Sequence, residues 1–231
     1  MRVLFLGMMS IAISVVSTSS LSAAEIKTPR APGSPPAAPG VAKPAPAPAA
    51  DKKTETAVFA GGCFWCTEFA FEQLAGVIDV ESGYCGGTKA TANYERVHRG
   101  TTAHAEAIRV TYDPEKITYD KLLDVFFDSH DPTQVNRQGN DEGRQYRSAI
   151  FFANEDQKKQ ADAKIEVLNA KRVHKKKIAT KLEPLTEFFP AEAYHQDFAR
   201  RNPLAPYIQH HAVPNGLQVR SKHPELMRKE D

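Results

Sequence analysis

Six periodic segments between residues 57 and 153 limit the folds open to this chain more than any other feature. Short apolar or alternating runs predict strands, whereas apolar residues at three- and four-residue spacing predict helices. Alternation in the third segment places Ile78 and Val80 on one face. This strand, helix, strand, strand, helix, strand series is the ferredoxin-like order, so we expect an α/β fold with helices packed on a mixed sheet. The segments cover residues 57–60, 64–75, 77–84, 106–112, 119–127 and 148–153.

Two of these segments carry the clearest periodicity. The segment 119–127 places its apolar residues at i, i+3, i+4, i+7 and i+8 behind a cap at Thr118, which predicts an amphipathic helix. In the segment 106–112, Glu106 lies on the same strand face as Ile108. Because that face is apolar, we expect the pKa of the Glu106 carboxyl to be raised.

The first 24 residues predict a secretory signal peptide. Arg2 precedes an apolar run that ends at Val16, and Ser22 and Ala24 supply the small residues that a cleavage site before Glu25 needs. An uncleaved N-terminal anchor is the alternative, although the run is short for a membrane span. We therefore expect an exported protein, periplasmic or secreted.

Proline and alanine dominate the segment that follows. Residues 29–48 hold eight of the 16 prolines, which favours an extended tether with little to bury. We expect this tether over residues 25–56, a folded domain that carries the chemistry over 57–200 and a C-terminal extension over 201–231. The sequence indicates no function for the extension.

The charge balance argues against nucleic acid as a partner. Residues 51–231 hold 26 basic and 27 acidic residues, so this region is near neutral. The basic run 171–177 contains no aromatic residue and follows a helix predicted from its cap Asn154 to about Lys171, which favours a solvated helix end. We expect a monomer that acts on a small molecule or a peptide.

The densest group of reactive side chains is Gly61-Gly62-Cys63-Phe64-Trp65-Cys66. The glycines allow a sharp turn, and Cys63 then stands at the start of a helix, where unpaired N–H groups favour a thiolate and lower the thiol pKa. Cys66 lies one helical turn further on, at a spacing that permits a disulfide. The chain holds three cysteines, too few for a disulfide framework, and an odd number leaves at least one thiol.

Four interpretations of these cysteines compete. A structural zinc site needs about four ligands, and only Cys85 accompanies the pair, so we expect no metal. A thioredoxin-type disulfide exchanger fits the spacing, although two aromatic residues between the cysteines are unusual for it. A thiol enzyme with an apolar pocket explains Phe64 and Trp65 as well. Two inert cysteines buried in a core helix are the fourth interpretation, and the preceding glycines argue against it.

Further blocks follow the cysteine pair along the chain. They are Gly83-Tyr84-Cys85-Gly86-Gly87, Tyr94-Glu95, His104-Ala105-Glu106, the polar loop 138–148 and the segment 193–198, which we predict to be helical. With Gly-Cys-Phe-Trp-Cys, and in this order, they make the chain resemble the peptide methionine sulfoxide reductase A family. The resemblance runs from about Val58 to Phe198.

The resemblance implies the family's α/β roll and its activity. Members reduce the S epimer of methionine sulfoxide, free or in proteins, to methionine, which repairs oxidised proteins. By resemblance, Cys63 is the nucleophile that attacks the sulfoxide sulfur, and Phe64 and Trp65 receive the S-methyl group. The family needs no metal or organic cofactor, and an external thioredoxin-like dithiol restores the enzyme.

The resemblance also assigns the polar residues. Glu106 and the hydroxyls of Tyr94 and Tyr146 bind the sulfoxide oxygen, while Asp141 organises the polar side of the site. The chemistry fits these residue types, because a sulfoxide sulfur is a poor electrophile until its oxygen is protonated or strongly hydrogen-bonded. The product on Cys63 is a sulfenic acid, which a second thiol converts to a disulfide.

The chain departs from the family at two positions. Many members carry glycine where Cys66 stands and place the resolving cysteine near the C-terminus, whereas this chain has no cysteine after Cys85. Cys85 occupies the variable position of Gly-Tyr-x-Gly-Gly, where alanine or serine is more common. The sulfenic acid on Cys63 must therefore be resolved by Cys66, by Cys85 or by both. We favour Cys66, which is one helical turn away.

Overall fold

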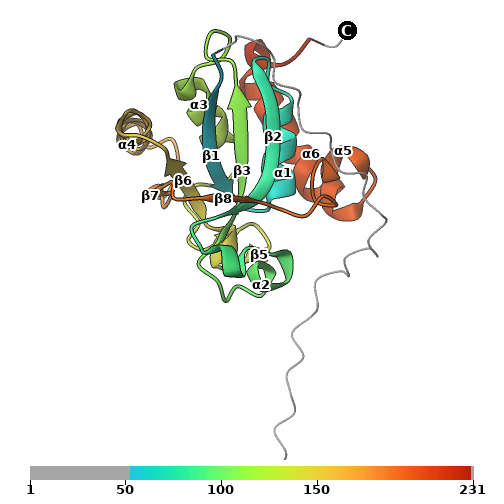
Figure 1. The fold of residues 1–231 in the computed structure, drawn as a ribbon. Helices are drawn as coiled ribbons and strands as arrows, with labels where there is room; N and C mark the ends of the chain where they lie inside the picture. Colours follow the sequence, from blue (N-terminus) through green and yellow to red (C-terminus); the bar gives the residue numbers. More distant parts are fainter. Residues whose placement is uncertain (1–52, 230–231) are drawn as a thin grey trace, which may run out of the picture. The chain divides into compact units, whose positions relative to one another are not determined.

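Strands and helices both occur along residues 53–229, the part of the chain that the computed structural model describes (Figure 1). The predicted signal peptide and the tether up to residue 52 lie outside the described residues, and the last two residues expected in the tether, Glu55 and Thr56, belong to a strand. The helices and strands are β1 (Glu55–Gly61), α1 (Phe64–Glu72), β2 (Val77–Cys85), α2 (Tyr94–His98), β3 (Ala105–Tyr112), α3 (Tyr119–Ser129), β4 (Arg137–Gln138), β5 (Asp141–Glu142), β6 (Ser148–Phe152), α4 (Glu155–Ala170), β7 (Lys181–Pro184), β8 (Phe188–Pro190), α5 (Phe198–Arg201) and α6 (Val213–Lys222).

Six strands form the main sheet in the order β7-β6-β1-β3-β2-β8. The four strands β6, β1, β3 and β2 pair antiparallel with their neighbours. With α1 and α3 between them in the chain, these strands have the ferredoxin-like arrangement, which confirms that prediction. Strand β7 pairs parallel with β6, so the sheet is mixed, as expected.

Helices α1 and α3 cover one face of the sheet, and the main core lies between them and the strands (Figure 1). The Phe59 ring of β1 is fully buried there, with its centroid 5.4 Å from that of Phe71, 6.0 Å from Tyr119 and 5.1 Å from Phe126. The predicted cap Thr118 begins the helix that carries the last two rings. Aromatic rings at these separations bury large apolar areas and fix the helices on the strands.

The opposite face of the sheet is lined mainly by small and apolar side chains, Cys85 among them. The chain from the end of β7 into β8, orange in Figure 1, crosses this face and adds Leu185 and Phe188 to the packing. Successive residues of a strand point to opposite faces, so Tyr84 packs toward α1 whereas Cys85 points away from it.

Two local features differ from the sequence prediction. The register of β2 against β3 shifts just after Val77, and this bulge turns Ile78 outward, with 48% of its surface exposed, while Val80 stays buried. The expected shared face of Ile78 and Val80 is therefore wrong. Helix α1 ends at Glu72 rather than near residue 75, because the chain reverses into β2 through Gly76, whose φ is 89°.

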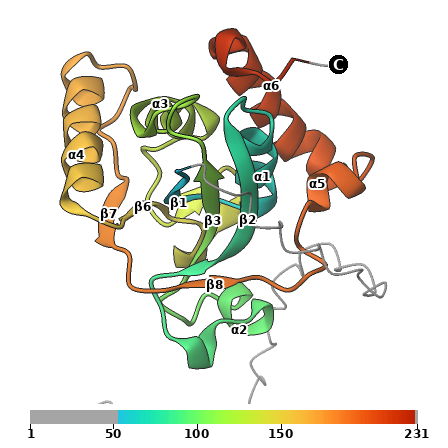
Figure 2. The ribbon, with the colours of Figure 1, turned by 45° about the horizontal axis from the view of Figure 1, so that its top comes forward.

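The residues beyond position 200 pack against α1 as part of the same folded unit (Figure 2). A π-helical turn at Ile208–Ala212 leads into α6, and both contact α1. Gly216 allows the closest approach, since a Cβ there would lie 2.6 Å from the ring of Phe69. None of the helices within residues 53–229 combines the length and the apolar character that crossing a bilayer requires.

Candidate active site

Cys63 stands where β1 ends and α1 begins, after a turn that only glycine fits. Gly62 has a φ of 102°, and a Cβ there would lie 2.7 Å from the side chain of Gln138. Cys63 is the N-cap of α1, and its side chain is hydrogen-bonded with that of Cys66, one turn further on. The fold therefore brings the two thiols of the Cys-x-x-Cys pair into contact.

The surroundings of Cys63 keep its thiol protonated. Burial raises the pKa of Cys63 well above its usual range, and Cys66, Glu106 and Asp141 raise it further. The expected lowering of this pKa by the helix N-terminus is wrong, because only 8% of the side chain is exposed and desolvation outweighs the helix dipole. A thiolate at this position therefore needs a neighbour that accepts the proton.

Glu106 is the neighbour placed to exchange that proton. Its Oε2 accepts a hydrogen bond from the backbone N–H of Phe64 at 3.1 Å, and the Cys63 thiol donates to the same carboxyl. Burial raises the pKa of Glu106 to about 8, and the nearby Asp141 adds to the shift, against the lowering effect of the two donors. The expected raised pKa is confirmed, and Glu106 holds a proton at neutral pH.

The polar side of the site is completed by two tyrosines and an aspartate. The Tyr146 hydroxyl lies 3.5 Å from Nδ1 of His98, and burial raises its pKa far above the usual range, so it remains a donor. Tyr94 opens α2 and stacks on His98 at a centroid distance of 5.1 Å. Asp141 accepts a hydrogen bond from the Tyr207 hydroxyl at 2.5 Å. Besides burial, electrostatic interactions with Glu106, Cys63, Asp141 and Tyr94 raise the pKa of Tyr146, so the predicted polar residues lie near one another.

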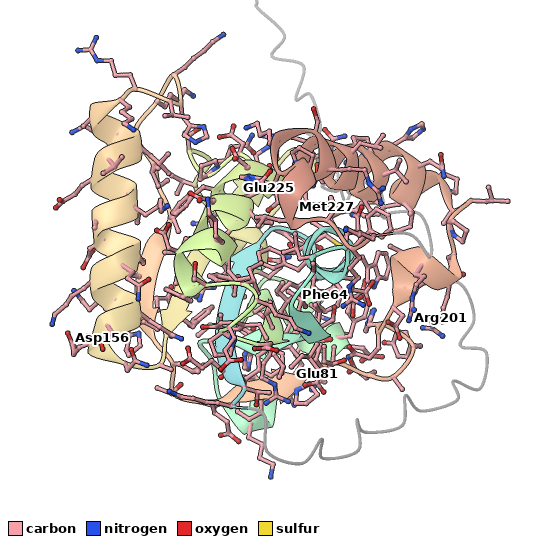
Figure 3. All side chains as sticks on the ribbon, turned by 90° about the horizontal axis from the view of Figure 1, so that it is seen from above. Phe64, Glu81, Asp156, Arg201, Glu225 and Met227 are labelled. Atoms are coloured by element: carbon pink, nitrogen blue, oxygen red, sulfur yellow. The ribbon has the colours of Figure 1, made fainter. Side chains whose placement is uncertain are left out.

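Phe64 and Trp65 lie beside Cys63 in a cluster of rings. Trp65 stacks on Phe198 with centroids 3.9 Å apart and an interplanar angle of 12°, and Tyr207 meets it edge-on at 5.8 Å. His195 lies 5.0 Å from Phe64. Phe64 begins α1, where Figure 3 labels it, and is 1% exposed. The cluster forms an apolar wall next to the reactive sulfur.

Sequence reasoning missed the part that residues 192–207 play in this wall. The segment 193–198, predicted to be helical, instead forms turns that pass through Asp197 at a φ of 53° before the short helix α5. The turns bury His195 to 1% exposure, and burial lowers its pKa to about 4. Within residues 53–229, neither ring nitrogen of His195 nor Nε1 of Trp65 has a hydrogen-bond partner, which is unusual for buried polar atoms. The sequence feature that could have indicated this wall is the set of aromatic residues Tyr194, Phe198 and Tyr207.

Cys85 lies on the far side of the sheet from Cys63. Its side chain is fully buried, its thiol donates to the Glu187 carbonyl at 3.4 Å, and burial raises its pKa to about 12. The strands of the sheet separate the two sulfurs. Of the two candidate resolving cysteines, the fold brings only Cys66 to Cys63.

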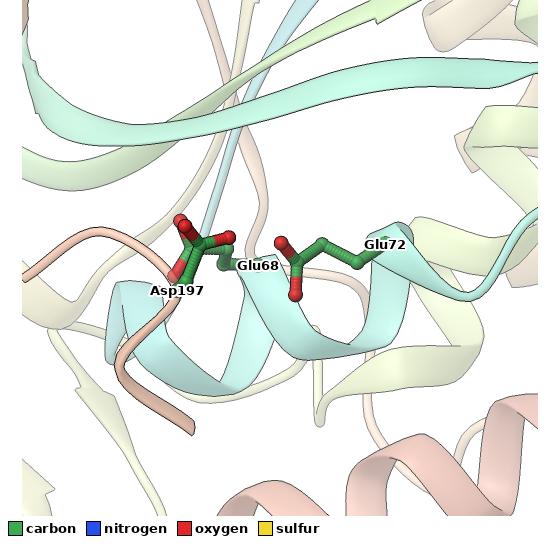
Figure 4. A group of neighbouring side chains, drawn as sticks. All are labelled: Glu68, Glu72 and Asp197. Carbon is green, nitrogen blue, oxygen red and sulfur yellow. The ribbon is translucent and has the colours of Figure 1, made fainter. Parts of the chain in front are cut away.

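Three carboxylates form a separate group between α1 and the segment before α5 (Figure 4). Oxygens of Glu68, Glu72 and Asp197 lie within 4.8 Å of one another, an arrangement that could hold a cation. However, the Arg200 guanidinium donates to Asp197 at 2.7 Å and supplies positive charge of its own. Three carboxylates that already have an arginine beside them do not identify a metal site.

The chain matches known proteins over most of its described length. The sequence model of the peptide methionine sulfoxide reductase family matches residues 55–226. Peptide methionine sulfoxide reductase MsrA 2 of Synechocystis sp. is 51% identical over 176 residues, which cover 76% of this chain and 82% of the relative. Peptide methionine sulfoxide reductase MsrA of Nautilia profundicola is 48% identical over 158 residues, which cover 68% and 90%.

Solved structures show the same relationship. Mxr1 from Saccharomyces cerevisiae in reduced form aligns with a TM-score of 0.62 and 37% identity over 69% of this chain and 91% of that one. Methionine sulfoxide reductase A of Corynebacterium diphtheriae aligns with a TM-score of 0.58 and 34% identity over 68% and 78%. This chain therefore belongs to the peptide methionine sulfoxide reductase A family and is an oxidoreductase that reduces methionine sulfoxide.

Proposed function

We propose that Cys63 reduces the S epimer of methionine sulfoxide and that the Cys66 thiol resolves the product. The observation that carries this proposal is the position of the Cys63 sulfur, which contacts both the Glu106 carboxyl and the Cys66 sulfur beside an apolar wall. A sulfoxide whose methyl group packs on Trp65 would direct its oxygen toward Glu106 and the tyrosine hydroxyls.

Glu106 carries the proton in this reaction. Its neutral carboxyl donates a proton to the sulfoxide oxygen, which makes the sulfur electrophilic, and the resulting carboxylate accepts the Cys63 proton. The Cys63 sulfur bonds to the substrate sulfur, and the oxygen then moves to Cys63 as the sulfide leaves. The step produces methionine and a Cys63 sulfenic acid without net release of a proton. Tyr94 and Tyr146 donate to the oxygen while its charge develops.

The Cys66 thiol then attacks the Cys63 sulfur. A Cys63–Cys66 disulfide forms, and the hydroxyl of the sulfenic acid leaves as water. An external dithiol of the thioredoxin kind reduces the disulfide by thiol exchange and returns both thiols. In each cycle the substrate loses one oxygen atom, and the dithiol supplies two electrons.

An assay with both epimers tests the activity. The reduced protein, with excess dithiothreitol, is incubated with each epimer of a blocked methionine sulfoxide, and methionine is quantified for wild type and for Cys63→Ser. We expect loss of the S epimer with wild type alone. No loss of the S epimer would overturn the proposal, and reduction of insulin disulfides without sulfoxide turnover would favour a disulfide exchanger.

A pair of cysteine variants tests the resolving step. Cys66→Ala is expected to release methionine in one turnover per enzyme but to stop cycling with thioredoxin as reductant. Cys85→Ala is the matched control and is expected to cycle at the wild-type rate, since Cys85 lies behind the sheet. Full thioredoxin-linked turnover by Cys66→Ala would assign the resolving role elsewhere.

We also propose that the chain is exported and works as a monomer whose folded domain follows a proline-rich segment. The basic start, the short apolar run and the small residues before Glu25 support export, and the proline-rich segment 29–48 supports a tether. Cell fractionation with N-terminal sequencing tests the proposal. A periplasmic or secreted product that begins at Glu25 is expected, and a cytoplasmic product that retains residue 1 would refute it.

A further inference from the structure

We propose that Glu192 is a positioning residue that fixes the distance between Glu106 and Tyr94. The proposal rests on the proposed function, in which these two residues hold the sulfoxide oxygen. Glu192 lies in the segment between β8 and α5, and its carboxylate joins two parts of the site that are far apart in the chain.

The two oxygens of Glu192 have different partners. Oε1 accepts a hydrogen bond from the backbone N–H of Tyr94 at 2.9 Å, and Oε2 accepts one from the Tyr84 hydroxyl at 2.8 Å. The Tyr94 N–H is at the start of α2, where backbone N–H groups have no partner within the helix. Glu192 thus holds Tyr94, the first residue of α2, through the backbone N–H of Tyr94.

Tyr84 connects this contact to Glu106. The two residues are direct cross-strand partners, Tyr84 on β2 and Glu106 on β3, so their side chains point to the same face of the sheet. The contacts therefore run from Glu106 through Tyr84 and Glu192 to Tyr94. They link the Glu106 carboxyl, which carries the proton, to the Tyr94 hydroxyl, which would bind the same sulfoxide oxygen. A shift of Tyr94 relative to β3 would misplace that hydroxyl.

The segment that carries Glu192 is itself fixed to β2. The Gln196 side chain accepts from the Ser82 backbone N–H and donates to the Ser82 carbonyl, each at 2.9 Å, as a neighbouring strand would. The Ala191 backbone N–H also donates to that carbonyl, at 2.9 Å. Glu192 is therefore presented from a rigid support rather than from a loose loop, which a positioning role requires.

Two substitutions separate this role from the charge of the side chain. Glu192→Ala removes both acceptors and frees the start of α2. Glu192→Gln keeps an oxygen for the Tyr94 N–H, and its amide can donate to the Tyr84 oxygen, so the link survives without the charge. We expect Glu192→Ala to lower the single-turnover rate of methionine formation by roughly 10- to 100-fold, because a displacement of about 1 Å has effects of that size. Glu192→Gln is expected to retain most of the rate.

A double-mutant cycle with Tyr94→Phe tests whether Glu192 acts through Tyr94. In the Tyr94→Phe background, Glu192→Ala is expected to cost less than about threefold further, since the hydroxyl it positions is already gone. Glu187→Ala, which removes an exposed carboxylate just before β8, is the control and is expected to match wild type. Thermal unfolding and the rate at which iodoacetamide alkylates Cys63 report whether the fold and the thiol are intact.

The outcomes distinguish the two proposals. A wild-type protein without S-epimer turnover overturns the proposed function. If wild type is active, three results would overturn the positioning role and leave the proposed function in place. Glu192→Ala could turn over at the wild-type rate, or Glu192→Gln could be as slow as Glu192→Ala. The rate losses of Glu192→Ala and Tyr94→Phe could also be fully additive in the double-mutant cycle.

Discussion

Replacement of Glu106 by glutamine is expected to stabilise the folded protein at neutral pH while it impairs catalysis. The carboxyl is 2% exposed and its pKa is raised to about 8, first of all by burial. Glutamine has the same size, carries no charge, and offers an oxygen to the Phe64 N–H that now bonds Glu106. It supplies no acidic proton, so turnover falls by roughly 10²- to 10⁴-fold.

The gain in stability depends on pH in a direction that the pKa determines. Between its usual value of 4.5 and the folded value of about 8, Glu106 holds a proton in the folded protein that the unfolded chain has released. The free energy of unfolding therefore falls as the pH rises through this window, by about 1.4 kcal/mol per pH unit. At pH 7 the loss amounts to about 3 kcal/mol, and the Glu106→Gln variant avoids it.

Urea unfolding at pH values from 5 to 9 measures this difference directly. The free energy of unfolding of Glu106→Gln minus that of wild type is expected to grow from pH 5 to 8 and to level off above pH 8. Glu115→Gln, at an exposed position, is the control and is expected to show a constant difference. A constant difference for Glu106→Gln over the same range would refute the inference that the folded protein keeps this carboxyl neutral.

Three further substitutions test the core and the site. Phe59→Ala removes a buried ring from the centre of the core and is expected to lower the free energy of unfolding, measured by urea titration, by about 3 to 5 kcal/mol. A loss below about 1 kcal/mol would contradict the packing described for this ring. Burial lowers the pKa of His130 to about 4, so protonation of this residue alone is expected to cost up to about 3 kcal/mol of stability as the pH falls from 6.5 to 4. The free energy of unfolding of His130→Gln minus that of wild type is expected to grow by this amount over that range, and a constant difference would contradict the lowered pKa. Trp65→Ala removes the main apolar surface beside Cys63 and is expected to lower kcat/KM for the S epimer by roughly 10- to 200-fold, mainly through KM, whereas an unchanged KM would place the methyl group elsewhere.

The central sheet was predictable because its signals are local. The spacing of apolar residues after Thr118 predicts α3. The order of the strand and helix segments along the chain predicts how the central strands are arranged in the sheet. The bulge after Val77 has no such signal, because it arises from the pairing of β2 with β3. Residues beyond 200 have weak periodicity of their own, and their helices are held by packing on α1.

The site was predictable in its residues but not in its electrostatics. Chain order and resemblance identify Cys63, Glu106 and Asp141, yet the pKa of the Cys63 thiol depends on how deeply the fold buries it. The role of Cys85 depends on which face of the sheet it occupies, which follows from the register of β2 rather than from its distance along the chain. Glu192 escaped notice because its partners lie about a hundred residues earlier, on β2 and α2.

The contact between Cys63 and Cys66 within one helical turn has a consequence for the speed of the redox cycle. A resolving cysteine on a distant tail must diffuse to the active site, and solvent friction slows that motion. Here both sulfurs are carried by the start of α1, so closure of the proposed disulfide needs side-chain rotation but no movement of a distant segment. The rate of disulfide formation is therefore expected to be insensitive to solvent viscosity, and Phe198 and Tyr207 can stay packed on Trp65 throughout turnover.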